Sequence, residues 1–164
     1  MARVVFDGNY QVLLVPDGDI TDRDAPTVAE LTDSYVIDIT SLCPKDFLDF
    51  GGSQGRVNAG DIRTRFSAQL MGTWLMDTTF TCFLDSDPAE NLAWLNLDDG
   101  QRWDVVILWA ATADSPADGD QAYVMPLEFG KHMPTNPAEN EQQRFTVEAA
   151  AYAEPHLEAI VVGG

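Results

Sequence analysis

Few residues of this chain are of the types that carry out catalysis. Its 164 residues contain two cysteines, Cys43 and Cys82, and two histidines, His132 and His156. A cysteine nucleophile needs a neighbouring base, and nothing in the spacing of Cys43 and His132 brings these two side chains together. Two cysteines 39 positions apart without a paired spacing are instead typical of buried thiols in a reducing compartment. The sequence therefore offers no candidate catalytic residue.

The acidic and glycine-rich stretches do not match a known metal or phosphate site. The twelve residues from Asp19 to Glu30 begin and end with an acid, as an EF-hand calcium loop does, but Asp24 stands where that loop needs glycine. Residues 51–55 (GGSQG) lack the Lys-Ser/Thr pair of a phosphate-binding loop. Weak binding of cations by clustered acids stays open. We expect no dedicated metal and no cofactor.

The charge of the chain excludes two classes of partner. It has 9 Lys and Arg against 27 Asp and Glu, a net charge of −18. Capture of nucleic acid or of an anionic lipid surface requires clustered cations. The N-terminus does not resemble a secretory signal, and no segment approaches the ~20 apolar residues that span a bilayer. The charge is explained by solubility, or by a surface that must not bind a polyanion passing nearby.

The segment Trp103–Ala111 (WDVVILWAA) predicts the central strand of the fold. Val105, Val106 and Ile107 are β-branched, and the only charge is Asp104 near the start. A short apolar run of this kind is typical of a strand that is covered on both faces. We therefore expect other elements to pack on both of its sides.

Six further segments predict strands because their residues alternate in polarity or are rich in β-branched and aromatic types. They are Tyr10–Val15, Tyr35–Leu42, Ile62–Leu70, Trp74–Leu84, Ala122–Phe129 and Gln143–Tyr152. We expect the third and fourth to form one antiparallel hairpin that turns at Gly72-Thr73. The fifth contains Pro126, which cannot donate to a neighbouring strand, so it is expected at a sheet edge.

One helix is expected at Asp87–Leu97. Asp87 is a candidate N-cap, Pro88 suits the first helical position and Glu90 follows the cap by three residues. Residues 26–33 (PTVAELTD) are compatible with a single helical turn or with an extended arm. The sequence thus predicts a single, mainly β domain over residues 1–164, a β-sandwich or partly closed barrel of six to eight mostly antiparallel strands with one packed α-helix.

A long arm is predicted at about residues 44–61. Pro44–Gly60 is glycine-rich and long for a connection inside a compact domain. Three of the nine cationic residues lie in or beside this arm, within ten positions. They form a solvated strand face, or they reach an acidic surface on a neighbouring copy of the chain and set the register of self-assembly. The candidate contact residues of the arm are Phe47, Phe50, Arg56, Arg63 and Arg65.

The C-terminal tail, at about residues 155–164, ends in the apolar run Ala159–Val162. An apolar terminus needs a partner, in this chain or in another. We expect Ile160, Val161 and Val162 to make this contact.

Four features carry a resemblance to a known family. They are, in chain order, a strand ending in Val15-Pro16 followed by Ala25–Thr32 (APTVAELT), the alternating strand Thr78–Leu84 leading to Asp87–Leu97, the strand Trp103–Trp109, and Phe145–Val147 before the tail Ala159–Gly164. In these features the chain resembles the major tail proteins, or tail tube proteins, of long-tailed bacteriophages, in the form common in phages of actinobacteria. The APTVAELT segment is the most specific, and Leu42–Asp61 departs from the family pattern.

The resemblance implies a structural subunit and not an enzyme. Members of that family form hexameric rings that stack into a tube, and DNA passes through a bore lined by a β-barrel of strands from all subunits. Implied partners are other copies of the chain and the terminator, tape-measure and distal tail proteins. DNA would pass without specific binding, no membrane is involved, and the protein would occupy the virion tail after assembly in the host cytoplasm.

An acidic bore agrees with the net charge, because like charges repel the phosphates of DNA. The candidate bore lining is the polar face of the predicted hairpin. Its residues are Ser67, Gln69, Asp77, Thr79 and Thr81. We expect the arm and the apolar tail to be buried only after subunits stack.

Two other functions stay open. A different virion structural protein, such as a tail terminator or a capsid decoration protein, would also be acidic, β-rich and non-enzymatic. A small-ligand-binding β-barrel would need a roomy apolar interior with converging polar groups. The many Trp and Phe residues favour a filled interior instead.

Overall fold

The computed structural model describes residues 10–58, 69–109 and 111–164, and within them the side chains of all residues but 55–58 and 69–73. The described chain is mainly β, as predicted, with nine strands in one sheet and only short helices. The strands are β1 (Tyr10–Pro16), β2 (Ile37–Asp38), β3 (Leu48–Asn58), β4 (Gln69–Phe83), β5 (Arg102–Trp109), β6 (Gln121–Phe129), β7 (Met133–Pro134), β8 (Arg144–Ala151) and β9 (His156–Ile160). The helical elements are α1 (Val28–Leu31), the 3₁₀ helix η1 (Thr40–Leu42) and α2 (Leu92–Asn96).

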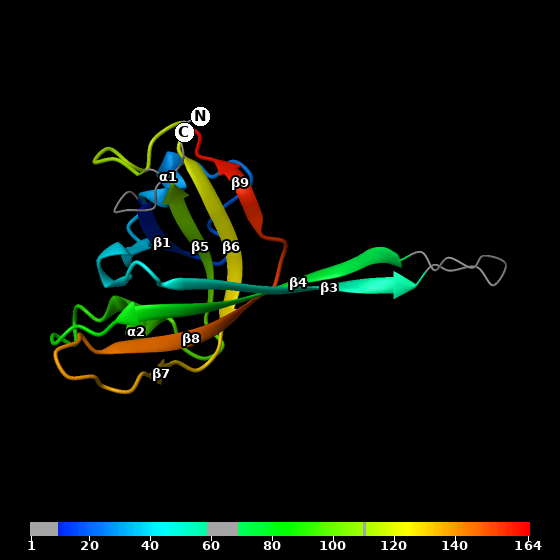
Figure 1. Cartoon of the computed structure of the whole chain (residues 1–164). Helices are drawn as coiled ribbons and strands as arrows, with labels where there is room; N and C mark the ends of the chain where they lie inside the picture. Colours follow the sequence, from blue (N-terminus) through cyan, green and yellow to red (C-terminus); the bar gives the residue numbers. More distant parts are fainter. Residues whose placement is uncertain (1–9, 59–68, 110) are drawn as a thin grey trace, which may run out of the picture.

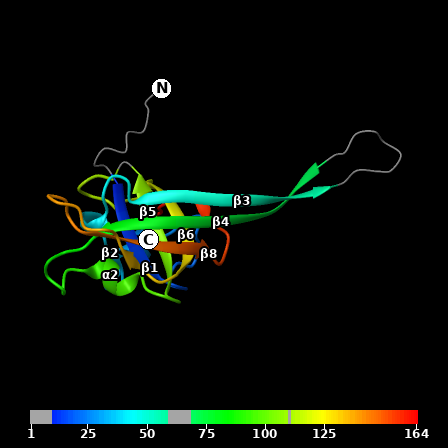
Figure 2. The same ribbon diagram turned by 60° about the horizontal axis from the view of Figure 1, so that its bottom comes forward.

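The sheet is antiparallel throughout and curls over on itself. Its strand order is β2-β1-β5-β6-β8-β4-β3, with β9 paired to β6 and β7 paired to β8. Figures 1 and 2 show β3, β4 and β8 running across the layer formed by β1, β5 and β6. This curl encloses the larger core between the two parts of the sheet. None of the helices among the described residues is long and apolar enough to span a membrane.

The prediction of a central strand covered on both faces is confirmed by β5. Val105 and Ile107 belong to the larger core, with β4, β6 and β8. Val106 and Leu108 belong to a second core, with β1, β6 and the C-terminal segment. All four side chains are at most 1% exposed. Burying each of these side chains stabilises the folded state by about 1.5–3 kcal/mol. Because two of them enter each core, β5 joins the two cores.

The single helical turn considered for residues 26–33 is present as α1. Thr27 and Glu30 form a capping box, in which the Thr27 hydroxyl accepts from the Glu30 N–H and the Glu30 carboxylate accepts from the Thr27 N–H. Leu31 points from this turn into the second core. The segment therefore closes one end of that core.

The predicted hairpin is wrong in its pairing. β4 is one continuous strand through Gly72 and Thr73, and it pairs with β3, in the stretch predicted to be a glycine-rich arm. A side chain at Gly51 would place its Cβ 3.1 Å from the carbonyl oxygen of Asp77. The glycine there allows close strand pairing, a role that composition alone does not distinguish from a loop. The predicted strand Ile62–Leu70 lies largely outside the described residues.

The main helix begins later than predicted. The carboxylate of Asp87 accepts from the N–H of Ala89 in a local turn, and α2 starts only after Asn91. Short polar side chains compete with helix formation by bonding to nearby backbone in this way. The helix position is set instead by Ala93 and Leu97, which are fully buried in the larger core.

Two other predictions are corrected by the sheet. The second predicted strand, Tyr35–Leu42, is divided between β2 and η1. The strand with Pro126, β6, is not at an edge, because it pairs with β5 on one side and with β9 and β8 on the other. The carbonyl of Pro126 accepts from the N–H of Tyr152, which lies in the connection between β8 and β9. The missing N–H thus falls where β6 changes partners, and it interrupts no ladder.

Candidate assembly surfaces

The β3–β4 hairpin extends far beyond the packed body of the protein (Figures 1 and 2). Its strands are paired from Leu48–Phe80 at the base to Asn58–Gln69 at the outer end, with one irregularity between Gln54 and Arg56. Among the described residues, no second layer covers the outer part of this long two-stranded ribbon. Its exposed side chains are therefore candidates for contact with another molecule.

The predicted contact residues of the arm differ in their surroundings. Phe47 is 3% exposed and stacks on Tyr10 with ring centroids 5.3 Å apart, so it is a core residue of its own chain and unavailable to a neighbour. Phe50 is 48% exposed and contacts Tyr123 edge-on. Arg56 lies in β3 opposite Met71. The predicted contacts Arg63 and Arg65 fall outside the described residues.

Two exposed side chains on the hairpin were not singled out by the sequence. Trp74 is 44% and Leu75 is 58% exposed. The alternation of β4 placed Trp74 on the same face as Met76 and Phe80, which are buried in the larger core. Trp74 lies further along β4, where the hairpin projects beyond the packed body of the protein. The alternation of a strand predicts which side chains share a face, but not where the layer that covers this face ends.

An acidic face covers the side of β3, β4, β8 and β6 that points away from the larger core. Residues directly opposite each other in antiparallel strands lie on one face, and the register joins Asp49 to Thr79 and Thr79 to Glu148. The same register joins Asp77 and Glu128 through Ala150. A groove of about 720 Å³ lies along this face. Its acidic lining residues are Asp77, Asp99, Glu128 and Glu148.

Two arginines on this face, among the side chains that the structure describes, are already paired. Arg102 donates from its Nε to Glu128 at 2.6 Å, and Arg144 lies 3.4 Å from Asp46. Within the described part of the chain, Asp77 and Glu148 have no ion-pair partner. The face therefore presents a net negative potential to whatever lies opposite.

Three of the five predicted bore-lining residues lie on the acidic face, namely Asp77, Thr79 and Thr81. Gln69 is in β4, and Ser67 lies outside the described residues. Glu128 and Glu148 were not named from the sequence. The signal for Glu148 was present, because the alternation of buried Phe145 and Val147 in β8 turns Glu148 outward.

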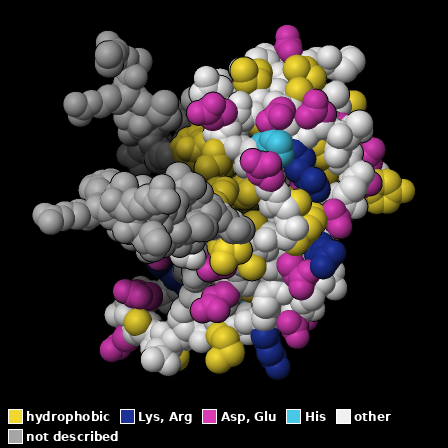
Figure 3. Space-filling model, turned by 90° about the vertical axis from the view of Figure 1, so that its right-hand side faces the viewer, with side chains coloured by type: hydrophobic (Ala, Val, Ile, Leu, Met, Phe, Trp, Pro, Cys, Tyr) yellow, Lys and Arg dark blue, Asp and Glu magenta, His cyan; other side chains and the backbone are white. Residues whose placement is uncertain are grey.

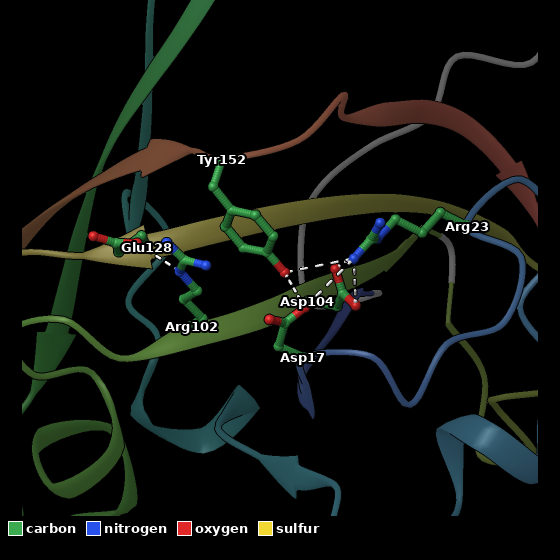
Figure 4. Close-up of polar contacts among 6 residues, drawn as sticks. All are labelled: Asp17, Arg23, Arg102, Asp104, Glu128 and Tyr152. Atoms are coloured by element: carbon green, nitrogen blue, oxygen red, sulfur yellow. Dashed lines mark hydrogen bonds and ion pairs between the residues drawn. The ribbon is translucent and has the colours of Figure 1, made fainter.

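A buried ion pair anchors the loop after β1 to the central strand (Figure 4). The guanidinium of Arg23 donates to both carboxylate oxygens of Asp104, at 2.8 and 3.2 Å. Asp104 is fully buried, whereas a quarter of the Arg23 side chain is exposed. Burial raises the pKa of Asp104, and the hydrogen bonds and charge of Arg23 oppose that rise.

Tyr152 links this pair to the edge of the acidic face. Its hydroxyl donates to Asp17, and its ring lies under the guanidinium of Arg102, 4.9 Å from the ring centroid (Figure 4). Burial and the bond to Asp17 raise the pKa of Tyr152. The network thus holds the β8–β9 connection against β5.

The C-terminal residues divide between the core and the surface. Val161 is fully buried in the second core, so the prediction that the tail is buried only after stacking is wrong for this residue. Val162 bonds through its backbone to Pro26 and Val28. Ile160 is 50% exposed beside a groove of about 630 Å³ that Trp109, Tyr123 and Leu157 also line.

Figure 3 views the molecule from the side on which the hairpin projects. Hydrophobic side chains gather in the middle of this view, and acidic side chains far outnumber basic ones around them. Apolar patches rimmed by polar residues are typical of sites where proteins associate.

The residues that could carry chemistry are not brought together. The ring of His132 contacts that of Trp94 in a tilted arrangement, and its Nδ1 lies 3.1 Å from the carbonyl oxygen of Leu97. Cys43 lies instead in the larger core with Cys82. Among the described residues, no group of three His, Cys, Asp or Glu side chains could hold a metal ion.

The chain is similar to chains in three solved structures at very low sequence identity. A chain in the virion of a native gene transfer agent particle has a TM-score of 0.48 and 10% identity, covering 78% of this chain and 90% of that one. A chain in the tail of an empty gene transfer agent particle has a TM-score of 0.49 and 8% identity, covering 91% and 96%. A chain of the anti-feeding prophage cap, a tube-terminating cap, has a TM-score of 0.52 and 11% identity, covering 92% and 88%.

A search of the curated proteins finds no match. The model of one protein family, however, matches residues 1–164, the full length of the chain. That family is described as phage tail tube protein. The chain therefore belongs to the phage tail tube protein family, and it is a structural subunit of a virion tail tube and not an enzyme.

Proposed function

We propose that this subunit self-assembles into stacked hexameric rings, and that its acidic face lines a bore through which DNA passes during ejection. The observation that carries the proposal is the concentration of Asp77, Glu128 and Glu148 on one continuous sheet face, where Arg102 and Arg144 are already paired. The stacked rings and the tube are inferred from the resemblance to the tail tube family. The polar face Asp77, Thr79 and Thr81 supports the same orientation of β4.

Electrostatics explains why such a lining suits a conduit. DNA carries one negative charge about every 1.7 Å along its axis, and a protein binds it by replacing counterions with Lys and Arg. A wall of carboxylates offers no such replacement, and a narrow low-dielectric channel strengthens the repulsion. DNA therefore slides along the wall and has no site at which to stop.

Assembly uses the surfaces that a single subunit leaves exposed. The β3–β4 hairpin, with Phe50, Trp74 and Leu75, contacts a neighbouring copy, and its arginines steer it toward acidic surface there. Ile160 and the groove beside it form a second contact. The terminator, tape-measure and distal tail proteins are further partners of the finished tube, which assembles in the host cytoplasm.

Charge reversal on the acidic face tests the proposal. Tubes of Glu148→Lys should bind a short DNA duplex at low salt, with affinity that falls steeply as salt is raised, because each subunit adds a cation to the bore. The fluorescence anisotropy of a labelled duplex, mixed with tubes that have been collected by sedimentation, measures this binding. Wild-type tubes should bind none.

The matched control is Asp114→Lys, which makes the same charge change in the exposed β5–β6 connection. Equal DNA binding by both variants would show that the acidic face is not the bore. Negative-stain microscopy of the same samples distinguishes the alternatives, because a terminator would stop at one ring and a tube protein stacks many.

A further inference from the structure

The sheet face that encloses the larger core continues beyond that core at one end. Ile107 of β5 belongs to the larger core, and Tyr123 of β6 lies directly opposite it. Gln121, two residues earlier in β6, shares this face, and Ile160 of β9 lies opposite Gln121. Both Gln121 and Ile160 are exposed. The face therefore extends onto β9, where no element that the structure describes covers it.

The groove beside Ile160 marks this uncovered end of the face. Trp109, Tyr123, Leu157 and Ile160 give the groove apolar walls, and the exposed Glu158 adds a carboxylate. Its volume of about 630 Å³ is in the range of pockets that hold a small molecule, so an aromatic side chain fits into it. Among the described residues, its lining includes none from β3 or β4, the strands that cover the larger core.

The β3–β4 hairpin carries its core-covering face past the edge of its own body. Trp74, Met76 and Phe80 share this face of β4 because they are separated by even numbers of residues. Met76 and Phe80 are buried in the larger core, whereas Trp74 is 44% exposed. A Cβ at Gly52 would lie 3.6 Å from the Nε1 of Trp74, so the indole lies where a side chain at this position would project. The hairpin thus presents one aromatic side chain on its core-covering face.

We propose that the hairpin of one copy docks in this groove of the adjacent copy, with Trp74 as its anchor. The inference rests on the self-assembly proposed above, and it names the two surfaces that meet. Asp77 of the acidic face and Trp74 lie on opposite sides of β4. When the acidic face is turned toward the bore, Trp74 is turned toward the protein wall. The docked hairpin continues, over the adjacent copy, the layer that β3 and β4 form over their own core.

Charge and symmetry favour a second copy of the chain as the occupant. Arg56 lies in β3 two positions after Gln54, which is opposite Trp74, and Glu158 lines the groove. Opposite charges of this kind guide two surfaces into register. Because the hairpin and the groove are different surfaces, each copy donates one and accepts the other. Such a heterologous contact repeats from copy to copy and closes into a ring when the rotation allows it.

A photochemical cross-link tests which surface meets the hairpin. Gln54 of the full-length chain is replaced by p-benzoylphenylalanine, because this exposed residue lies opposite Trp74 on the same face. Tubes are assembled from equal amounts of isotopically heavy and light chains, irradiated, digested and analysed by mass spectrometry. We expect cross-linked peptides that join residue 54 of one copy to Gln121–Tyr123 or His156–Ile160 of another.

The critical concentration for polymerisation gives a second measurement, which does not need the cross-linker. Trp74→Ala should raise this concentration about tenfold or more, because truncating an aromatic anchor at the centre of an interface has effects of this size. In an Ile160→Ala background the same substitution should have a much smaller effect, since the two side chains share one contact. Leu95→Ala is the matched control background. Leu95 is 60% exposed on α2, outside the groove, so the effect of Trp74→Ala should there be undiminished.

The outcomes distinguish this contact from assembly as such. Tubes in which residue 54 is cross-linked only to other parts of the neighbour, or only within its own chain, would overturn the docking and leave the tail tube function standing. So would an equal effect of Trp74→Ala in all three backgrounds. A native chain that stays monomeric at high concentration would overturn the proposed self-assembly together with the docking. Circular dichroism of the dilute variants confirms that each subunit is folded.

Discussion

At the scale of single residues, the ion pair of Arg23 and Asp104 is the most consequential polar contact in the body. Asp104 is fully buried, and the residues opposite it on the two neighbouring strands, Val15 and Pro126, are apolar. A buried carboxylate is tolerated only if it is paired and hydrogen-bonded. Arg23 supplies both hydrogen bonds from a loop far away in sequence, so the pair fixes where that loop lies.

Removing the arginine should be strongly destabilising. Arg23→Met leaves the charge of Asp104 buried and unpaired, and we expect a loss of about 3 kcal/mol in the free energy of unfolding. Urea denaturation of the dilute subunit measures the loss. Arg102→Met removes an arginine from an exposed pair and should cost much less. Equal losses in the two variants would contradict the role given to burial.

The same variant should become less destabilised as the pH falls. The pKa of Asp104 is raised above its ordinary value of 3.8 by burial, although Arg23 lowers it. Because this pKa is raised, the folded state binds the proton more readily than the unfolded state does. Protonation of Asp104 therefore contributes stability at low pH, and this contribution is lost as the pH rises through the pKa of the folded state. Without Arg23 this pKa rises further, and protonation relieves the unpaired charge.

We therefore expect the loss in Arg23→Met to be smaller at about pH 5 than at about pH 7. Urea denaturation at both pH values measures the difference. In an Asp104→Asn background, the effect of Arg23→Met should no longer depend on pH over this range. A loss that is the same at both pH values in the presence of Asp104 would show that this carboxyl is not the titrating group.

At the scale of elements, the C-terminal segment serves the core with one face and the surface with the other. Val161 and Ala159 are buried in the second core, while Ile160 between them is half exposed. The alternation of a strand produces this division. Folding and assembly should therefore be separable by substitutions at adjacent positions.

Ile160→Glu should leave the free energy of unfolding within about 0.5 kcal/mol of wild type, because half of the side chain is already exposed to solvent. It should block polymerisation by placing a charge in an apolar contact. Val161→Glu should unfold the subunit, since it buries an unpaired carboxylate. Circular dichroism and sedimentation measure the two effects. Normal tubes from Ile160→Glu would remove this surface from the assembly contacts.

At the scale of the whole molecule, charge is distributed unevenly. Three of nine cations fall at positions 56, 63 and 65, while the chain as a whole carries −18. Stacking subunits of such charge is opposed by their mutual repulsion. A cationic arm that reaches acidic surface on a neighbour offsets that repulsion and aligns the copies.

Arg63→Glu or Arg65→Glu should therefore prevent tube formation and leave the subunit folded. Lys131→Glu is the control, because it makes the same charge change in the connection before β7. Negative-stain microscopy detects tubes, and circular dichroism reports folding. Normal tubes from both arginine variants would exclude the pairing.

The sequence by itself determined what each segment buries. The run of β5 is apolar on both faces and β8 alternates, and both patterns report local burial directly. They led to the mainly β class and to the central strand. The order of several weak motifs along the chain led to the family. That order can be read from the sequence without knowing which segments contact each other.

The tertiary structure decided which segments became neighbours. β4 pairs with the glycine-rich β3 across a long connection, β6 accommodates Pro126 where it changes partners, and Arg23 reaches Asp104 from 81 positions away. The choice among possible partners depends on the apolar area that the whole chain buries at once, and each strand pattern is compatible with several partners. For that reason the acidic side chains could be counted from the sequence, but their gathering on one face could not.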